Sequence, residues 1–545
     1  MNKTLRSRIP KWVLDPVLPI LLILFTIGIA LYYITGPMLV MFNSDYADSL
    51  IWANVTAETG DILSSDFHYA AILPFGAPLW MVPILKIFGF GITAQVLSMA
   101  VFAIIFIPSV YFFFRSLKWK RLSAAASTAC FCLVMTGSDV LLEMFWGHTI
   151  YYSLGLLFWM LLMGLTLRLV DTSRSWKKGN KISIRTILEL SAVAILCAGC
   201  ATNGFQVLAL GVVPVAGALV ACAFFDQTPL VNKAHLRKVA LVGLMLVAIA
   251  VGFVILRVIT KNGSIQAKYA NAHMVWGDSN NWIANVMKIF PSAAYLFGIA
   301  AKDGLKLMSV RSVFYALKLL ALMVIFVSPV IMFLRYKKLN ENAKTVLWSH
   351  LIVTCVIGFM YVFGPLSYGN WRLIPCLSTG LIVTVLWIKD LLAGTRVEKR
   401  IAAALAVLMA AVCLINVLQV ARMPRNIQKN VHWEVTQVLK EKGYDYGFAT
   451  FWNSHPIVFL SDSEIQVTSV KQVGVELEPH MYQNFKQEFQ PREDKDTCFL
   501  MLEKDEYANV QKGEYWKRLN STRKLVDSFE CGEFIVLVYD GCIIV

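Results

Sequence analysis

Two carboxylates that could accept a proton follow the first long apolar run of the chain, residues 17–33. Asp45 and Asp48 stand three residues apart, so a helix would place both on one face. A carboxylate just beyond a membrane segment is partly desolvated, which raises its pKa and suits it to take a proton from a hydroxyl group. We therefore predict that Asp45 is a general base and that Asp48 assists it. The alternative is that these acids cap an interfacial helix or are solvated.

Four more candidates lie in the same stretch, residues 42–69: Glu58, Asp61, Asp66 and His68. The imidazole of His68 is suited to binding a phosphate or a sugar, and a hydrogen-bonded loop histidine is the alternative. We interpret the three acids as ordinary loop residues, because none of them combines proximity to the first apolar run with a chemical task.

A second polar group, Asp139, Glu143 and His148, begins directly after the apolar stretch 122–138. Glu143 and His148 stand five residues apart, whereas ligands on one face of an α-helix stand three or four apart. Three interpretations stay open for this group: orientation of an acceptor, a divalent metal site, and simple solvation at the membrane interface.

Arg372 lies in the segment YGNWRLIP, residues 368–375. A guanidinium group binds phosphate through two parallel hydrogen bonds and suits a site that must neutralise a phosphate. An interfacial arginine whose head reaches toward the lipid headgroups is an equally good interpretation of this residue alone.

Composition places these residues in a membrane protein. Of the 545 residues 57% are hydrophobic and 16% are charged, and the mean hydropathy is +0.61. Soluble domains contain about 45–50% apolar and about 25% charged residues. Runs of about 20 apolar residues predict a mainly α polytopic bundle of about eleven spans: 17–33, 92–114, 122–138, 150–170, 187–203, 205–225, 239–259, 313–334, 345–364, 373–389 and 401–421.

The distribution of charge predicts the orientation of the bundle. The net charge of +15 comes from Lys and Arg that gather in every second connection between spans, which excludes a nucleic-acid partner and makes these connections cytoplasmic. The N-terminus is then cytoplasmic and the first outer loop is 34–91. Residues 74–89 fit this orientation as a short interfacial helix, because they contain three prolines and Lys86.

Two domains follow from this pattern: a transmembrane domain, 1–421, and an extracytoplasmic α/β domain, 422–545. The second has ordinary charge density, one predicted helix ending at Gly443, and four predicted strands: 446–452, 464–470, 497–504 and 533–540. Three of its residues are Cys, and an outside location permits a disulfide between two of them, with no pairing readable. No phosphate-binding loop with strand–helix context appears in the chain, so ATP-driven transport is unsupported.

Several segments together resemble the GT-C superfamily of integral membrane glycosyltransferases. They are NSDYAD at 43–48, LPFGAPLWMVPILKIFG at 73–89, FFFRSLKWKR at 112–121, SDVLLEMFWGH at 138–148 and YGNWRLIP at 368–375. A soluble C-terminal domain outside the membrane is also common in that superfamily. One departure is that Asp45 is followed by Tyr46 and not by the frequent Glu, so the resemblance does not imply a metal-binding carboxylate pair.

The resemblance implies that a sugar passes from a polyprenyl-phosphate carrier to an acceptor outside the cell membrane, usually with inversion. The acceptor would be a cell-envelope glycan, a lipid or a protein. Asp45 would take the proton of the acceptor hydroxyl, and Arg372 would neutralise the leaving phosphate. The other substrate-binding candidates are Asp48, His68, Asp139, Glu143 and His148.

Two other functions remain open. A transporter or flippase of a lipid-linked or small polar solute would place its polar residues near the bilayer midplane, often in two matching halves. This chain has its acids in outer loops and shows no internal repeat, which disfavours transport. A polysaccharide ligase or polymerase would use the same donor but depend on a basic outer loop.

Overall fold

The computed structural model describes residues 15–179, 181–225, 232–267, 275–300, 306–490 and 492–543. Residues 1–14, predicted to be cytoplasmic, lie outside this part of the chain. Ten helices of the described residues are long and apolar enough to cross a membrane. The outer surface of the first helix agrees with this assignment, because its apolar side chains Ile20, Leu21 and Leu24 are exposed where lipid would contact them. The chain is a multi-pass membrane protein, as predicted.

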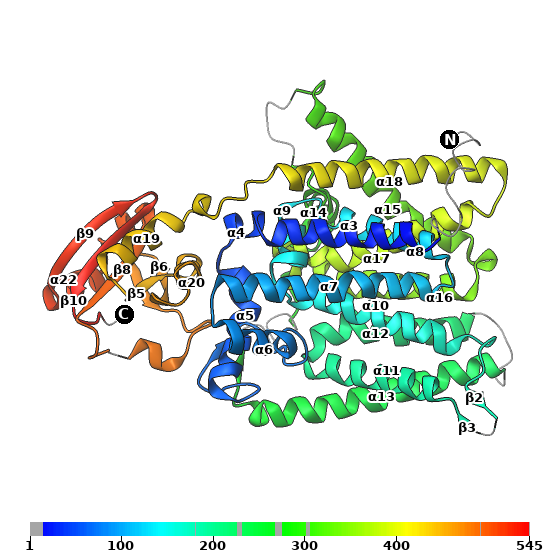
Figure 1. The fold of residues 1–545 in the computed structure, drawn as a ribbon, viewed down its shortest axis with the longest axis horizontal. Helices are drawn as coiled ribbons and strands as arrows, with labels where there is room; N and C mark the ends of the chain where they lie inside the picture. Colours follow the sequence, from blue (N-terminus) through cyan, green and yellow to red (C-terminus); the bar gives the residue numbers. More distant parts are fainter. Residues whose placement is uncertain are drawn as a thin grey trace.

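The long helices lie side by side and run along the longest axis of the molecule (Figure 1). They are α3 (Val17–Ile34), α7 (Ile92–Ser116), α10 (Tyr151–Val170), α11 (Ile184–Thr202), α12 (Gly204–Phe225), α13 (Lys233–Ile259), α15 (Val310–Leu334), α16 (Glu341–Val362), α17 (Ile374–Leu391) and α18 (Arg396–Arg422).

The predicted third span, 122–138, is shorter than expected. Its helix α8 (Arg121–Val134) has 14 residues, about 21 Å at 1.5 Å per residue, whereas a hydrocarbon core is about 30 Å thick. The chain continues from α8 through α9 (Asp139–Leu142) and the π-helix η1 (Glu143–Gly147). These three pieces together carry it to the end of the bundle that bears the C-terminal domain (Figure 1).

Two short helices follow α3 and its extension α4 (Pro37–Met41) at this same end of the bundle. In α5 (Ser44–Thr59), the Asn43 side chain accepts a hydrogen bond from the backbone N–H of Asp45, and Gly60 ends the helix in the left-handed conformation. The segment predicted to be a short interfacial helix forms α6 (Pro78–Phe88), with 11 residues.

Residues beyond α18 form one mixed six-stranded sheet in the order β7-β6-β5-β8-β10-β9. The central strand β5 pairs in parallel with β6 and β8, and β10 pairs antiparallel with β8 and β9. The strands are β5 (Tyr446–Thr450), β6 (Gln466–Val473), β7 (Glu476–Pro479), β8 (Thr497–Glu503), β9 (Leu525–Cys531) and β10 (Phe534–Asp540).

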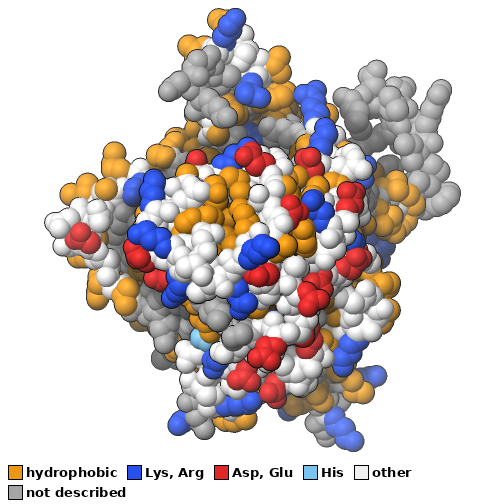
Figure 2. Space-filling model, turned by 90° about the vertical axis from the view of Figure 1, so that its left-hand side faces the viewer, with side chains coloured by type: hydrophobic (Ala, Val, Ile, Leu, Met, Phe, Trp, Pro, Cys, Tyr) orange, Lys and Arg blue, Asp and Glu red, His pale blue; other side chains and the backbone are white. Residues whose placement is uncertain are grey.

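The four predicted strands correspond to β5, β6, β8 and β10, and the predicted helix is α19 (Trp433–Lys442), ended by Gly443. One boundary is wrong: Phe451 and Trp452, expected at the end of a strand, open the helix α20 (Phe451–Leu460). The sequence did not predict the strands β7 and β9 or the helices α21 (Lys504–Val510) and α22 (Glu514–Thr522). Acidic and basic side chains are interspersed over the outer end of this domain (Figure 2).

Candidate active site

A cavity of about 770 Å³ lies where the helix bundle meets the C-terminal domain. Its lining comes from α5, η1, the start of α10, the segment before α17, and the C-terminal domain. Five of the seven residues singled out in the sequence line this one cavity: Asp45, Asp48, Glu143, His148 and Arg372. Residues more than 300 positions apart in the chain therefore surround one space.

Asp45 occupies the first turn of α5 and is half-buried. Burial raises the pKa of its carboxyl group to about 6, an effect that nearby His148 opposes and Glu143 reinforces. A carboxylate with this pKa is ionised at neutral pH yet accepts a proton more readily than an ordinary aspartate, which is the property a general base needs.

Asp48 has the same helix face but a different environment. It is buried and accepts a hydrogen bond from the amide of Gln483, whose oxygen accepts one from the indole of Trp52 at 2.8 Å. Burial, followed by the charge of Asp45, raises the pKa of Asp48 well above its ordinary value. Through Gln483, Asp48 thus ties α5 to the C-terminal domain.

The π-helix brings Glu143 and His148 together. A π-turn bonds residue i to residue i+5, and the backbone N–H of His148 donates to the carbonyl of Glu143. Their side chains approach to 3.6 Å between Oε1 and Nε2. The expectation that five-residue spacing separates these groups assumed an α-helix and is wrong for this reason. A β-carbon at Gly147 would lie 2.4 Å from the ring of Tyr46, so the close approach of η1 to α5 requires glycine there.

Arg372 reaches the cavity from the 3₁₀-turn η6 (Asn370–Leu373). Its guanidinium lies 5.1 Å from the ring centre of Tyr368 and 5.9 Å from that of Tyr152, and it donates a hydrogen bond to the Tyr368 hydroxyl. Two aromatic faces thus hold a fixed positive charge at the cavity wall.

The C-terminal domain contributes residues that the sequence did not reveal. Phe451 is central among them: its ring packs edge-on against Trp452, His480 and Tyr482 at centroid distances of 5.1–5.4 Å. Its carbonyl accepts a hydrogen bond from the hydroxyl of Ser44, next to Asp45, at 2.5 Å. The complete set from this domain is Thr450, Phe451, Trp452, Val470, Lys471, Gln472, His480, Tyr482 and Glu506.

Two predicted residues lie outside this cavity. His68 belongs to the short strand β1 (His68–Tyr69), which pairs with β4 (Gln266–Ala267), and its backbone bonds to Gln483 and Asn484. Asp139 lines a separate cavity of about 260 Å³. Burial, reinforced by Glu143, raises the pKa of Asp139.

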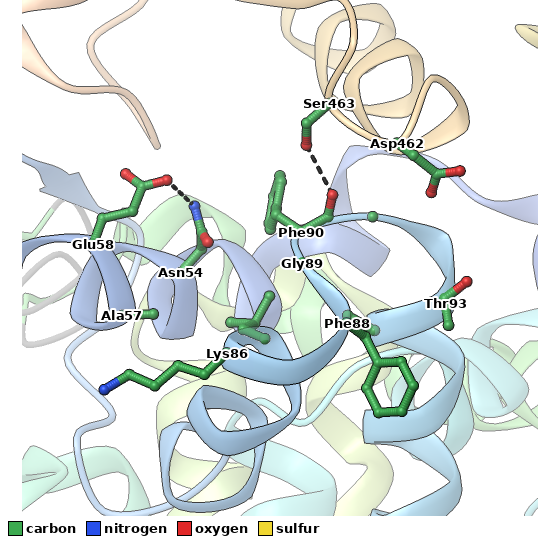
Figure 3. Close-up of a pocket in the computed structure, with 13 residues that line it drawn as sticks. Asn54, Ala57, Glu58, Lys86, Phe88, Gly89, Phe90, Thr93, Asp462 and Ser463 are labelled. Atoms are coloured by element: carbon green, nitrogen blue, oxygen red, sulfur yellow. Dashed lines mark hydrogen bonds between the residues drawn. The ribbon is translucent and has the colours of Figure 1, made fainter.

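A second cavity of about 770 Å³ marks the seam between the two parts of the chain (Figure 3). Its polar rim includes Asn54, Glu58 and Lys86 from α5 and α6, facing the turn that follows α20. The hydroxyl of Ser463 in that turn donates to the carbonyl of Phe90 at 2.8 Å. Glu58 accepts a 2.6 Å hydrogen bond from Asn54. It lies in the last turn of α5, so its interpretation as a loop residue is wrong.

Within the described ranges, no group of three His, Cys, Asp or Glu side chains is placed to hold a metal ion. Glu143 and His148 approach each other, but neither Asp45 nor Asp48 completes a ligand set with them. The divalent metal left open by the sequence therefore does not fit these residues as they stand.

No protein-family model and no curated protein sequence matches the chain. Solved structures do. The oligosaccharyltransferase of Archaeoglobus fulgidus, in complex with zinc and sulfate, aligns with 95% of this chain and 73% of its own, with a TM-score of 0.50 and 12% identity. ArnT from Cupriavidus metallidurans aligns with 95% of this chain and 97% of its own, with a TM-score of 0.44 and 13% identity.

AglB from A. fulgidus, bound to an inhibitory peptide and a dolichol-phosphate, aligns with 84% of this chain and 65% of its own, with a TM-score of 0.47 and 13% identity. At these identities the oligosaccharyltransferase match is evidence of fold alone. It confirms the predicted architecture: the chain has a GT-C-type fold, a polytopic helical bundle with a small C-terminal α/β region.

Proposed function

We propose that this protein is a membrane glycosyltransferase that moves a sugar from a polyprenyl-phosphate carrier to an acceptor outside the membrane, with inversion. The observation that carries the proposal is the shared cavity of Asp45 and Arg372, a base with a raised pKa and a held cation. The GT-C-type fold supports it by analogy.

In the proposed reaction an acceptor hydroxyl gives its proton to the carboxylate of Asp45 while its oxygen attacks the anomeric carbon of the donor. The bond from that carbon to the carrier phosphate breaks, and the electron pair leaves on the phosphate oxygen. A single displacement of this kind inverts the anomeric configuration. Arg372 neutralises the charge that grows on the leaving phosphate, and this is its catalytic task.

The acceptor enters between α5 and the C-terminal domain in this proposal. Phe451, Tyr482 and the half-exposed Trp452 offer apolar ring faces at the cavity, and such faces pack well against the apolar face of a sugar ring. His148 and Glu143 line the same cavity and orient the acceptor hydroxyl in this proposal.

We also propose that the C-terminal domain lies outside the cell. The β2–β3 hairpin (Lys177–Lys178 and Lys181–Ile182) supports this orientation, because its basic residues lie at the opposite end of the bundle (Figure 1). Basic connections remain on the cytoplasmic side of a membrane.

Donor turnover by the full-length protein in nanodiscs tests the proposal. Wild type should release polyprenyl phosphate from a labelled polyprenyl-phosphate sugar in the presence of an acceptor. Asp45→Asn should lose about 10²–10⁴-fold in rate, the usual contribution of a general base. The matched control is Asp66→Asn, an exposed acid of the same loop outside the cavity, which should keep wild-type turnover.

Full turnover by Asp45→Asn would overturn the assignment of the base. Solute flux into liposomes, together with no cleavage of any polyprenyl-phosphate sugar, would overturn the glycosyltransferase itself and favour a transporter.

A further inference from the structure

A separate cavity of about 320 Å³ lies at the far end of the bundle, away from the C-terminal domain. It opens among the last turns of α7 and α10 and the first turn of α11. One carboxylate, Asp171, lines it together with five cationic side chains: Arg115, Lys118, Arg168, Arg174 and Arg185.

Carboxylates nearby balance only part of this charge. Glu189 accepts from Arg168 at 3.1 Å and Arg185 at 3.3 Å, and from Arg174 as well. Asp171 pairs with Lys118 at 2.7 Å. Five cations therefore face two carboxylates. Cations are favoured at helix C-termini, and this accounts for Arg115 and for Arg168, each taken alone. It does not account for their position around one cavity, because solvated side chains would interact with the helix ends equally well.

One donor in the cluster has no acceptor. Nη2 of Arg174 is buried and makes no hydrogen bond within the described part of the chain. The neighbouring Arg237 has partners for both of its terminal nitrogens, since it donates to the carbonyls of Asp171 and Arg174, and it lies 5.1 Å over the ring of Trp176. A buried charged donor is costly unless an acceptor reaches it, and an anion in the cavity that Arg174 lines would supply one.

We infer that this cavity binds the phosphate of an anionic phospholipid headgroup. Guanidinium groups bind phosphate oxygens in pairs. Beside Arg185 on α11, Ile184 and Leu188 are 77% and 64% exposed, so the rim of the cavity continues into a lipid-facing surface where acyl chains would lie. The exposed lysines of the adjacent β2–β3 hairpin add attraction for an anionic leaflet. The inference is independent of the proposed sugar transfer.

Lipid binding to the delipidated full-length protein in detergent tests this site. Dioctanoyl phosphatidylglycerol should bind at least about tenfold more tightly than dioctanoyl phosphatidylcholine, and high salt should weaken the difference. Arg174→Gln should weaken phosphatidylglycerol binding by about tenfold or more, and Arg115→Gln by about fivefold. Arg115 donates to the carbonyl of Trp119, whereas Glu189 pairs with three other arginines. Arg115→Gln therefore leaves the ion pairs of Glu189 in place and tests the site if Arg174→Gln fails to fold.

Lys181→Gln is the matched control, because it removes one exposed charge from the hairpin outside the cavity. It should change binding by less than about twofold in 0.15 M salt. Equal affinity for both lipids, or an equal loss in Lys181→Gln and Arg115→Gln, would overturn the site. Binding of inorganic phosphate without any gain from the lipid would overturn the lipid as its ligand.

Discussion

Asp45 and Asp48 show how neighbouring carboxylates on one helix acquire different properties. Asp45 faces the cavity with a pKa of about 6, whereas Asp48 is enclosed by Gln483 and Trp52, and burial raises its pKa well above the ordinary value. The sequence predicted the common face correctly from the three-residue spacing. It could not predict the difference, because the group that encloses Asp48 comes from a residue 435 positions later in the chain.

Asp45 should cost the protein stability at neutral pH. Its pKa is about 6 in the folded state against 3.8 ordinarily, so folded protein binds more protons than unfolded protein between these values, and stability falls as pH rises through this window. Asp45→Asn removes the charge without changing the shape of the side chain. We expect a higher Tm for Asp45→Asn than for wild type at pH 8, and a difference that shrinks as pH falls from 6 to 4.

Differential scanning fluorimetry of both proteins in the same detergent measures this effect. Asp66→Asn, at an exposed position, should show no pH-dependent difference from wild type. A lower Tm for Asp45→Asn than for wild type at pH 8 would mean that the folded protein stabilises the ionised carboxylate. The pKa of Asp45 would then not be raised by folding.

The short elements at the membrane surface position the site more than the long helices do. The lengths of the apolar runs predicted the bundle, because hydrophobic length decides whether a helix can span the membrane. The prolines and Lys86 of 74–89 predicted a short interfacial helix. The π-helix η1 was not predictable, since no local residue type distinguishes it from an α-turn. It depends on tertiary packing of Gly147 against Tyr46. The same holds for α20, whose first residues Phe451 and Trp452 have strand propensity but open a helix and line the cavity.

Gly147→Ala tests the role of η1. The added β-carbon would lie 2.4 Å from the ring of Tyr46, so η1 and α5 must move apart and separate His148 from Asp45. We expect a loss of about 1–3 kcal/mol in stability, typical of overpacking, and a fall in turnover larger than this loss of stability explains. Thermal unfolding and donor turnover measure the two effects.

The control is Gly243→Ala in α13, where an added β-carbon meets no atom within 4 Å. Alanine is favoured over glycine inside a helix by about 0.5–1 kcal/mol, so this variant should be as stable as wild type or more so. If Gly147→Ala keeps wild-type stability and turnover, the close approach of η1 to α5 is not needed for either.

On the scale of the whole molecule, the candidate active-site cavity is lined jointly by the bundle and by the C-terminal domain docked on it. Gln483 is a main tie between them, since its side chain bonds both Asp48 and Trp52 of α5. Asn430 adds three bonds to the carbonyls of Leu39, Val40 and Phe42. The composition of residues 422–545 predicted a separate α/β domain. The way this domain docks on the bundle could not be predicted, because it depends on single polar contacts that form no pattern in the sequence.

Gln483→Leu should loosen the docked domain. The change leaves the buried carboxyl of Asp48 and the indole N–H of Trp52 without partners, at a cost of about 1–3 kcal/mol. Hydrogen exchange should become faster in both α5 and the loop around residue 483, and turnover should fall. Gln487→Leu, at an exposed position in the following turn, should leave both unchanged. Unaltered exchange in Gln483→Leu would show that other contacts carry the docking.

The pH dependence of kcat/KM for donor turnover tests the central claim most directly. Wild type should lose activity tenfold per pH unit below about pH 6, because protonated Asp45 cannot act as the base. Asp48→Asn should keep this acid limb, since the pKa of Asp45 is set by burial, His148 and Glu143. Asp45→Asn should retain at most about 1% of the activity and show no limb near pH 6. An acid limb of the same position and height in Asp45→Asn would contradict the assignment of Asp45 as the catalytic base.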